Sequence, residues 1–259
     1  MEFPVLSGNL CVRCGDTLAA PALSSTSELL CRPCRMAPPL FERAVAFGPY
    51  EGRMRVAIHA LKYDRLHAAA HGLGRMLAEA ITQLAGEAPP EMLVIPVPLH
   101  RTKYAQRGFN QARSLATHAL TFLGNSHPEW RLTLASSTLM RLRATQSQAG
   151  LTPRQRRLNV RGVFTVSDPA AVAGKHILLV DDILTTGATA RAAAKALMEA
   201  GAESVWVATL ARARRTSYSQ RSTSAHLYDA EATSGLPGLV AAANLQEEFT
   251  YSSHDQPSF

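Results

Sequence analysis

Two neighbouring carboxylates, Asp181 and Asp182, stand at the end of an apolar run, in the stretch HILLVDDILTTGAT. Small and hydroxylated residues follow them and open an alanine-rich helical segment. A helix N-terminus offers unpaired amides and a partial positive charge, which together favour an anion. Gly187 allows the backbone to close around that anion. The stretch contains no GxxxxGK[ST] pattern, which excludes a Walker A loop.

The two acids suit a different part of the same ligand. Ionised carboxylates accept strongly from vicinal hydroxyls. Amides that hold a phosphate and carboxylates that hold a diol together describe a ribose 5-phosphate, and the acids would also stabilise positive charge on the sugar ring. One alternative is an N-capped helix with incidental acids. Another is a receiver domain, but here the acid pair lies late in the chain and no second strand-ending Asp follows it.

A second polar segment, IPVPLHRTKYAQRGFNQA (95–112), follows another apolar run. Its prolines restrict the chain, and Arg101, Lys103 and Arg107 add positive charge. A pyrophosphate leaving group needs such compensation when a glycosidic bond breaks. Asn110 and Gln111 stand at the start of a helical pattern, where each is able to contact a ligand or cap the helix.

Positive charge continues through the segment 141–164. Between residues 101 and 161 there are eleven Lys or Arg against one acid, Glu129, an excess of ten, whereas the whole chain carries +7. Long polar loops in compact domains are often lids, so we expect the stretch from Arg143 to Arg157 to close over the site. The alternative is a solvated basic face, which is the better interpretation for most of these arginines taken singly.

Four cysteines near the N-terminus form two CxxC pairs separated by sixteen residues: Cys11, Cys14, Cys31 and Cys34. Two such pairs predict a structural zinc held by four thiolates, with Gly15 completing the first knuckle. A module this small buries too little core to fold alone, so the metal would hold it together. Unliganded thiols or a redox pair are the alternatives.

The elements that must position these residues alternate between strand and helix. Apolar runs at 92–97, 176–180 and 204–210 predict buried parallel strands, and the segment between the last two predicts a helix that ends before Gly201. Further helices are expected at 51–63, 68–84 and 109–123. This alternation predicts an open, mostly parallel α/β sheet flanked by helices. Such sheets bind ligands at the carboxyl ends of their strands, where Asp181 and Asp182 fall.

The chain divides into three zones: a cysteine module at 1–38, an α/β domain at 40–212 and a C-terminal extension at 213–259 that we expect to be partly disordered. The pI of about 9.6 indicates an acidic partner. We expect a cytoplasmic protein, because the start lacks a signal-peptide pattern and no apolar run is long enough to span a membrane.

Several of these segments resemble known families. VDDILTTGAT resembles the motif with which type I phosphoribosyltransferases bind 5-phosphoribosyl 1-pyrophosphate (PRPP). Together with AFGPYEG and IHALKYD (46–64), the segment 95–112 and RATQSQAGLTPRQRRLNV (143–160), it resembles the ComF family, in that family's order over roughly residues 1–212. The more specific parts are RGFNQ and one pattern of separate residues: Thr145, Gln148, Leu151, Arg156 and Asn159.

The resemblance implies a type I phosphoribosyltransferase fold with a small N-terminal zinc ribbon, binding of PRPP with Mg²⁺, and transfer of the phosphoribosyl group to an unidentified acceptor. Asp181 and Asp182 would hold the ribose, and Lys103 and Arg107 would stabilise the departing pyrophosphate. The remaining PRPP-binding residues would be those of the phosphate loop and of the loop after the earlier strand: Thr185, Thr186, Gly187, Ala188, Thr189, Leu99, His100 and Arg101.

A second hypothesis is a single-stranded DNA-binding protein built on the same fold, with or without catalysis. Such proteins combine a positive groove with aromatic platforms, and aromatic residues make up only 6% of this chain. The association of the ComF family with natural competence implies DNA and the competence machinery as partners. Both hypotheses can hold together.

Overall fold

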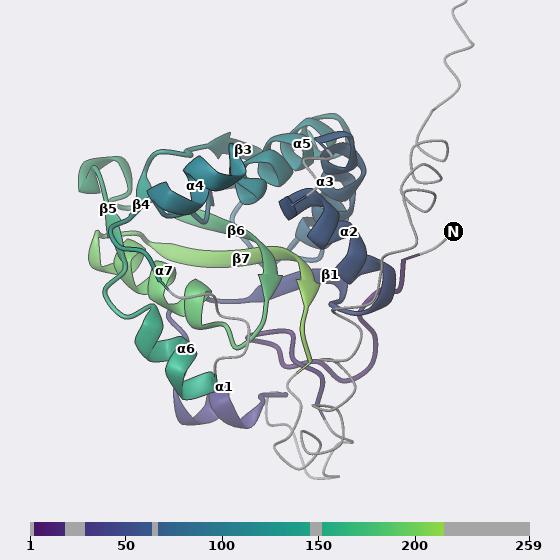
Figure 1. The fold of residues 1–259 in the computed structure, drawn as a ribbon, viewed down its shortest axis with the longest axis horizontal. Helices are drawn as coiled ribbons and strands as arrows, with labels where there is room; N and C mark the ends of the chain where they lie inside the picture. The colour runs from purple at the N-terminus through teal and green to yellow at the C-terminus, as the bar shows by residue number, and fades with distance from the viewer. Residues whose placement is uncertain (1–2, 19–28, 64–66, 146–151, 215–259) are drawn as a thin grey trace, which may run out of the picture. The chain divides into compact units, whose positions relative to one another are not determined.

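The computed structural model describes residues 3–18, 29–63, 67–145 and 152–214 (Figure 1). The helices are α1 (Arg32–Met36), α2 (Gly52–Tyr63), α3 (His67–Thr82), α4 (Arg101–Arg107), α5 (Gln111–Ser126), α6 (Pro153–Asn159), the 3₁₀ turn η1 (Pro169–Ala171) and α7 (Ala188–Glu199). The strands are β1 (Ala44–Pro49), β2 (Glu91–Pro96), β3 (Arg131–Leu134), β4 (Leu139–Arg141), β5 (Phe164–Val166), β6 (His176–Leu184) and β7 (Ser204–Arg212). None of these helices is long and apolar enough to cross a membrane.

Within these ranges, parallel strands form a five-stranded sheet in the order β1-β7-β6-β2-β3. A short antiparallel pair, β4 and β5, stands apart from it. The central strands are apolar on both faces because helices cover both sides, as parallel sheets require. The predicted open, mostly parallel α/β sheet is therefore confirmed.

The two faces of the sheet hold separate cores. On β6, Leu178 and Val180 pack into the core that includes α2, α3 and α5, whereas Ile177 and Leu179 pack into the core that includes α7 and the cysteines. Figure 1 shows α3 and α5 on one side of the strands and α7 on the other. This alternation follows from the two-residue period of a strand.

The sheet has a topological switch point between β2 and β6. These strands are neighbours, but the chain leaves β2 through α4 and α5 toward β3, and leaves β6 through α7 toward β7, on the opposite side. Connections that diverge in this way leave a crevice at the carboxyl ends of the two strands, where open α/β sheets bind ligands. The segments after β2 and β6 are the two that the sequence singles out for chemistry.

The structure changes two expectations about local structure. The strand predicted at 176–180 continues to Leu184, because its last residues still pair with β7, from Asp181 opposite Thr209 to Leu184 opposite Arg212. The segment 141–164, expected as a long loop, contains the helix α6 and strand residues of the β4–β5 pair. The extension from 215 onward lies outside the described residues, so the expectation of disorder stays a prediction.

Candidate functional site

Asp181 and Asp182 lie where β6 loses one of its neighbours. β2 pairs with β6 only as far as Pro96 opposite Val180, although the amide of Val97 still donates to the Val180 carbonyl at 2.8 Å. The two acids follow directly and border the crevice at the switch point. The amide of Asp182 donates to the Asp181 carboxylate at 2.9 Å, and Asp182 is only 5% exposed. The pair therefore lies on a strand, with Asp182 buried and Asp181 partly exposed.

Lys62 forms an ion pair with the Asp182 carboxylate. It lies on α2, its side chain is 18% exposed, and that of Asp182 is 7% exposed. Burial alone would raise the pKa of Asp182, but the charge of Lys62 and its hydrogen bond outweigh burial, so the pKa is lowered. Likewise, burial would lower the pKa of Lys62, but Asp182 outweighs it and raises the pKa. Asp182 is thus kept ionised by an internal counter-ion.

Asp181 is in the opposite situation. Burial, and then the charge of Asp182, raise its pKa well above the usual range. A hydrogen bond from the Asp182 backbone and the charge of Lys62 act against this rise in pKa. Asp181 in turn acts to raise the pKa of Arg141 on β4. Two neighbouring carboxyls in such surroundings ionise at different pH values, Asp182 at a lower and Asp181 at a higher pH than an ordinary carboxyl.

Cations from α4 complete the surroundings of the acids. Arg107 lowers the pKa of Asp182 electrostatically, and its guanidinium donates to Gln111 at 2.6 Å. Burial lowers the pKa of Lys103, helped by the charges of Arg141, Arg107 and Lys62. Lys103 and Arg107 are four residues apart and share one face of α4. An anionic group beside the acid pair would meet several positive charges here.

The caps of α4 show why this helix forms and correct one expectation. The predicted loop from Leu99 to Lys103 is helical from Arg101 onward. His100 is its N-cap, with Nδ1 accepting from the Thr102 amide at 3.3 Å. Gly108 ends the helix at φ 83°, in the left-handed region that glycine tolerates. Arg101 is exposed at the first residue of the helix, so of the predicted cations the structure brings Lys103 and Arg107 to the acids.

The segment 185–189 connects β6 to α7 as a phosphate loop would. Gly187 has φ 76° and occupies the N-cap position of α7 without a side-chain cap. The hydroxyl of Thr186 accepts from the amide of Ala188 at 3.4 Å. The amides in the first turn of a helix have no acceptors within the helix, which is the general basis of anion binding at helix N-termini.

The four cysteines gather as metal ligands do. Their sulfur atoms all lie within 4.8 Å of one another, and Cys14 and Cys31 are 3.6 Å apart. A tetrahedral zinc with Zn–S bonds of about 2.3 Å needs sulfurs about 3.8 Å apart, so the cluster fits a metal such as zinc. Gly15, at φ 62°, turns the first knuckle where a Cβ would meet the Ala44 carbonyl at 3.2 Å.

Comparison with known proteins agrees with this geometry. A family model described as a phosphoribosyl transferase domain matches residues 105–230. The DNA utilization protein YhgH of Salmonella typhimurium is 33% identical over 207 residues, which cover 79% of this chain and 84% of that protein. Its counterpart in Escherichia coli K12 is 34% identical, over 78% of this chain and 84% of that protein. The chain belongs to the ComF family. Competence protein F of Haemophilus influenzae is 27% identical over 206 residues, covering 78% of this chain and 84% of that protein.

In this ComF-family protein the basic segment 141–164 lies partly beside the acids. Arg141 places its guanidinium 5.5 Å from the ring centre of Phe164 and donates to the Thr145 hydroxyl. Its Nε is buried and has no hydrogen-bond acceptor among the residues that the structure describes. Arg143 donates to the Arg161 carbonyl at 2.8 Å. Gln148 and Leu151 fall outside the described residues, so the lid over 143–157 stays a prediction.

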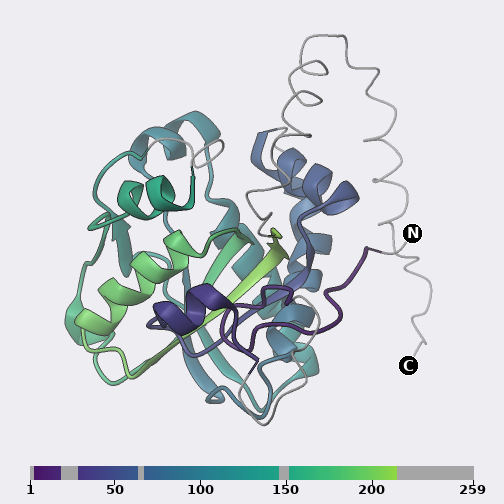
Figure 2. The same cartoon turned by 90° about the horizontal axis from the view of Figure 1, so that it is seen from below.

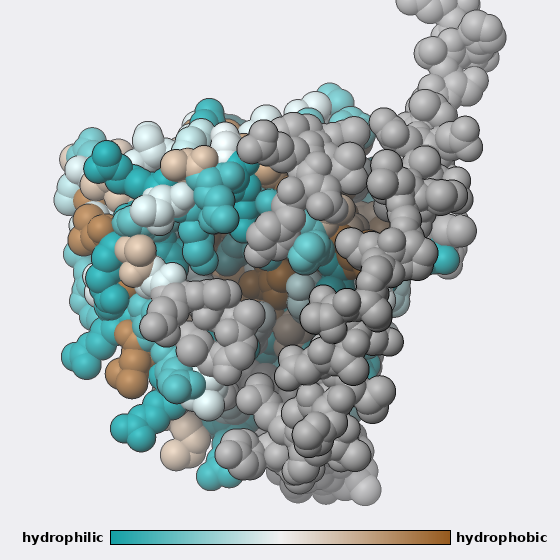
Figure 3. Space-filling model, viewed as in Figure 1, coloured by the Kyte–Doolittle hydropathy of each residue, from teal (hydrophilic) through white to brown (hydrophobic). Residues whose placement is uncertain are grey.

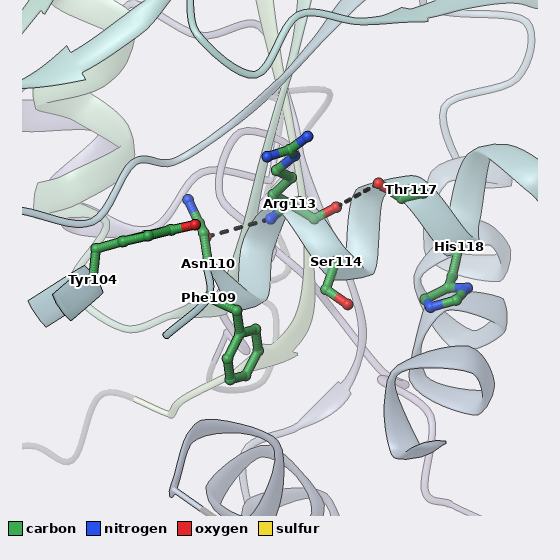
Figure 4. Close-up of a pocket in the computed structure, with 7 residues that line it drawn as sticks. All are labelled: Tyr104, Phe109, Asn110, Arg113, Ser114, Thr117 and His118. Carbon is green, nitrogen blue, oxygen red and sulfur yellow. Dashed lines mark hydrogen bonds between the residues drawn. The ribbon is translucent and has the colours of Figure 1, made fainter. Parts of the chain in front are cut away.

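A cavity of about 240 Å³ lies beside α4 and the start of α5 (Figure 4). Asn110, the N-cap of α5, accepts from the Ala112 amide at 2.9 Å and donates to the Val97 carbonyl at 3.0 Å. Asn110, which lines the cavity, therefore also contacts the segment after β2. It is lined by aromatic, basic and polar side chains: Tyr104, Phe109, Asn110, Arg113, Ser114, Thr117 and His118.

Sequence reasoning did not assign a role to Lys62 or Arg141. Lys62 stands in the IHALKYD segment and Arg141 in a basic stretch, and neither segment by itself indicates which charge they meet. The sequence does carry one indication for Lys62, which is that it lies next to the apolar residues Ile58 and Leu61 of α2. Both of these are fully buried. A lysine beside a buried face is expected to meet a counter-charge, but which one depends on the packing.

Proposed function

We propose that this ComF-family protein binds PRPP with Mg²⁺ and transfers its phosphoribosyl group to an acceptor. One observation carries the proposal. A glycine-containing loop and a carboxylate pair lie on one strand–loop–helix unit, at the switch point of the sheet, and cations from α2, α4 and β4 lie near the acids. A phosphate, a diol and a pyrophosphate occur in this order in PRPP.

Each part of the ligand has a matching part of the site. The amides at the start of α7 and the hydroxyls of Thr185, Thr186 and Thr189 take the 5-phosphate. Asp181 and Asp182 accept from the ribose hydroxyls and stabilise the cationic sugar in the transition state. Lys103 and Arg107 compensate the charge that the leaving pyrophosphate gains.

Mg²⁺ would neutralise the pyrophosphate and enter the site with it. The oxygen ligands this ion prefers are carboxylates, phosphates and water, and the acid pair offers carboxylates beside the crevice. Lys62 holds Asp182 ionised in the free protein, so that a carboxylate rather than a carboxylic acid meets the incoming sugar.

The test is calorimetric titration of the zinc-loaded protein with Mg²⁺ and PRPP, comparing wild type with Asp182→Asn. The variant removes a charge but keeps the shape of the side chain, and we expect affinity to fall at least tenfold. Asp168→Asn is the matched control, because Asp168 caps the η1 turn through its hydrogen bond to Ala170, and asparagine caps equally well. Equal affinity in wild type and Asp182→Asn would remove the acid pair from the ligand site.

Transfer is tested separately from binding. Release of pyrophosphate from PRPP is measured against a panel of acceptors, with an Asp181→Asn/Asp182→Asn double variant as the blank. Turnover in the wild type that the double variant lacks supports a transferase and identifies the acceptor. If PRPP binds but no acceptor in the panel gives turnover, the protein is a PRPP-binding protein rather than a transferase for those acceptors.

DNA binding is a second candidate function, favoured by the printed names of the relatives, DNA utilization protein and Competence protein F. The cavity of Figure 4 supplies an aromatic and basic lining, and Figure 3 shows hydrophilic side chains gathered over the α4 region. Tyr104 is 48% exposed there. Single-stranded nucleic acids stack on such rings and pair their phosphates with arginines.

The DNA test is fluorescence anisotropy of a labelled single-stranded oligonucleotide over a range of salt concentrations. The affinity should fall steeply with salt, with a logarithmic slope of about −0.7 for each phosphate contact. Tyr104→Ala and Arg113→Ala should weaken binding, whereas Arg75→Ala, which removes an exposed arginine paired with Glu79 on α3, should not. A binding constant that does not change with salt would argue against this function.

A further inference from the structure

Arg212 is the most deeply buried cation in the described part of the chain. It is the last residue of β7, and it is 2% exposed. Its guanidinium donates through Nε to the Cys14 carbonyl at 3.0 Å and through Nη1 to the Leu184 carbonyl at 2.9 Å. Nη1 also donates to the carbonyls of Thr185 and Ala213, and Nη2 lies 3.2 Å from the Asp16 carboxylate. A buried guanidinium is costly unless its donors are satisfied in this way.

These acceptors come from two segments that are remote in sequence. Cys14 and Asp16 belong to the first cysteine knuckle, and Cys14 lies 198 positions before Arg212 in the sequence. Leu184 ends β6, and Thr185 begins the loop that leads to α7. Asp16 is itself buried, at 6% exposed. One side chain therefore fixes the metal-site knuckle and the start of the phosphate loop to the same point.

A second arginine joins the same two parts from the other end of the loop. Arg191, in the first turn of α7, donates to the Ala37 carbonyl at 2.6 Å and places Nη2 3.7 Å from the sulfur of Cys34. Arg212 places its Nη2 3.9 Å from the sulfur of Cys14. In Figure 2, the purple N-terminal segment with α1 lies against the green ribbon of α7 and β7. Each cysteine pair thus has one arginine beside a sulfur.

The charges of the two arginines would balance that of the cysteine cluster when it holds a divalent metal. Four thiolates around a divalent ion carry a net charge of −2, which two neighbouring guanidiniums would offset. Cationic hydrogen-bond donors to ligand sulfurs also orient the ligands of a metal site. If the cluster lost its ion, the segments around Cys14 and Cys34 would lose the metal that fixes them, and the elements that Arg212 and Arg191 hold against them would loosen.

We propose that Arg212 and Arg191 are positioning residues that couple metal occupancy of the four-cysteine cluster to the anion affinity of the loop 185–189. The proposal rests on the proposed function in taking PRPP as the anion. Through Arg212 and Arg191 the cluster supports both the strand end and the helix between which the loop lies. Because coupling between two binding sites is reciprocal, bound PRPP must retain the metal more tightly by the same factor by which the metal strengthens PRPP binding.

The test compares Arg212→Met and Arg191→Met with wild type and with Arg214→Met, an exposed arginine whose partner is Glu51. Zinc content is measured first, and proteins with equal zinc are titrated with Mg²⁺ and PRPP by calorimetry. The rate at which a chromogenic chelator removes zinc is then followed with and without PRPP. Couplings of this kind are typically about 5- to 150-fold.

We expect both test variants to bind PRPP about tenfold more weakly while still holding zinc, and PRPP to slow zinc loss markedly in the wild type but little in the variants. Arg214→Met should behave as wild type. An arginine that only stabilised the fold would lower the unfolding temperature and leave the PRPP effect on zinc loss intact. The proposal would be overturned if both variants bound PRPP with wild-type affinity and PRPP still slowed their zinc loss as it does in the wild type. If Arg212→Met does not fold, Arg191→Met, which is less buried, decides alone.

Amide hydrogen exchange separates this proposal from the function it rests on. Exchange in peptides covering 184–190 should rise in the zinc-loaded variants relative to wild type, even if the wild type binds no PRPP. Absence of PRPP binding in the wild type would refute the proposed function, whereas unchanged exchange of the loop in both variants would refute the coupling.

Discussion

Replacement of Lys62 by methionine should lower the free energy of unfolding, because the charge of Asp182 loses its buried counter-ion. The change keeps the length of the side chain and removes its charge from a pair that is largely buried, with 18% and 7% of the two side chains exposed. Breaking a buried ion pair by removing one partner costs about 3–5 kcal/mol, because the remaining charge is left without compensation. We therefore expect Lys62→Met to lose about 3 kcal/mol of unfolding free energy at pH 8.

The loss should depend on pH in a defined direction. In the wild type the pKa of Asp182 is lowered, so the ion pair contributes stability above the unfolded carboxyl pKa, and this contribution is lost as the pH falls through the lower folded pKa. Without Lys62, the two largest influences that lower the pKa of Asp182 are gone, and only the weaker ones of Asp181 and Arg107 still oppose burial, so the pKa rises. The variant then takes up a proton on acidification, so the difference from wild type should shrink between pH 8 and pH 5.

Urea unfolding at both pH values measures this difference, in a double-mutant cycle with Asp182→Asn. Each single variant leaves one buried polar partner unpaired, so the double variant should be more stable than the sum of the two losses predicts. Lys195→Met is the matched control, because Lys195 and Glu199 form an exposed ion pair on α7, and such pairs contribute about 0.3–0.5 kcal/mol. Additive losses, or a Lys62→Met protein within about 0.5 kcal/mol of wild type at pH 8, would refute the reasoning.

Three further outcomes follow from the structure. Because burial and Asp182 raise the pKa of Asp181, binding of Mg²⁺ and PRPP to the ionised acids should release protons and should strengthen as the pH rises. Calorimetry in two buffers of different ionisation enthalpy measures this, and no net proton exchange at any pH tested would contradict it. Gly187→Ala should destabilise the protein by about 1 kcal/mol because φ is 76°. Gly124→Ala, in the last turn of α5 with open space around its Cβ position, should instead stabilise it by about 0.5 kcal/mol. Equal melting temperatures for the two variants would speak against the strained loop. Removal of metal from the cysteine cluster with a strong chelator should lower the melting temperature, and full recovery should require added zinc.

Much of the candidate site was predictable because its residues are close together in sequence. Asp181, Asp182 and Gly187 lie in one stretch that runs from a buried strand into a helix, so their relative placement follows from local geometry. The two CxxC pairs are equally local, and each makes its own knuckle. The end of β6 was less predictable, because pairing with β7 continues past the point where β2 has left the ladder.

The sequence by itself determined the chemical character of this protein: a loop of threonines and glycine that follows an acid pair, a cysteine cluster, and apolar runs that require a parallel sheet covered on both faces. These follow from residue type and short spacing, which act before the chain folds. Only the tertiary structure decided which cations meet which anions. Lys62, Arg141 and Arg212 are ordinary basic residues in the sequence, and their roles arise because packing removes them from water beside Asp182, Asp181 and Asp16. Burial makes each of these charges require a partner, and the fold determines which partner is within reach.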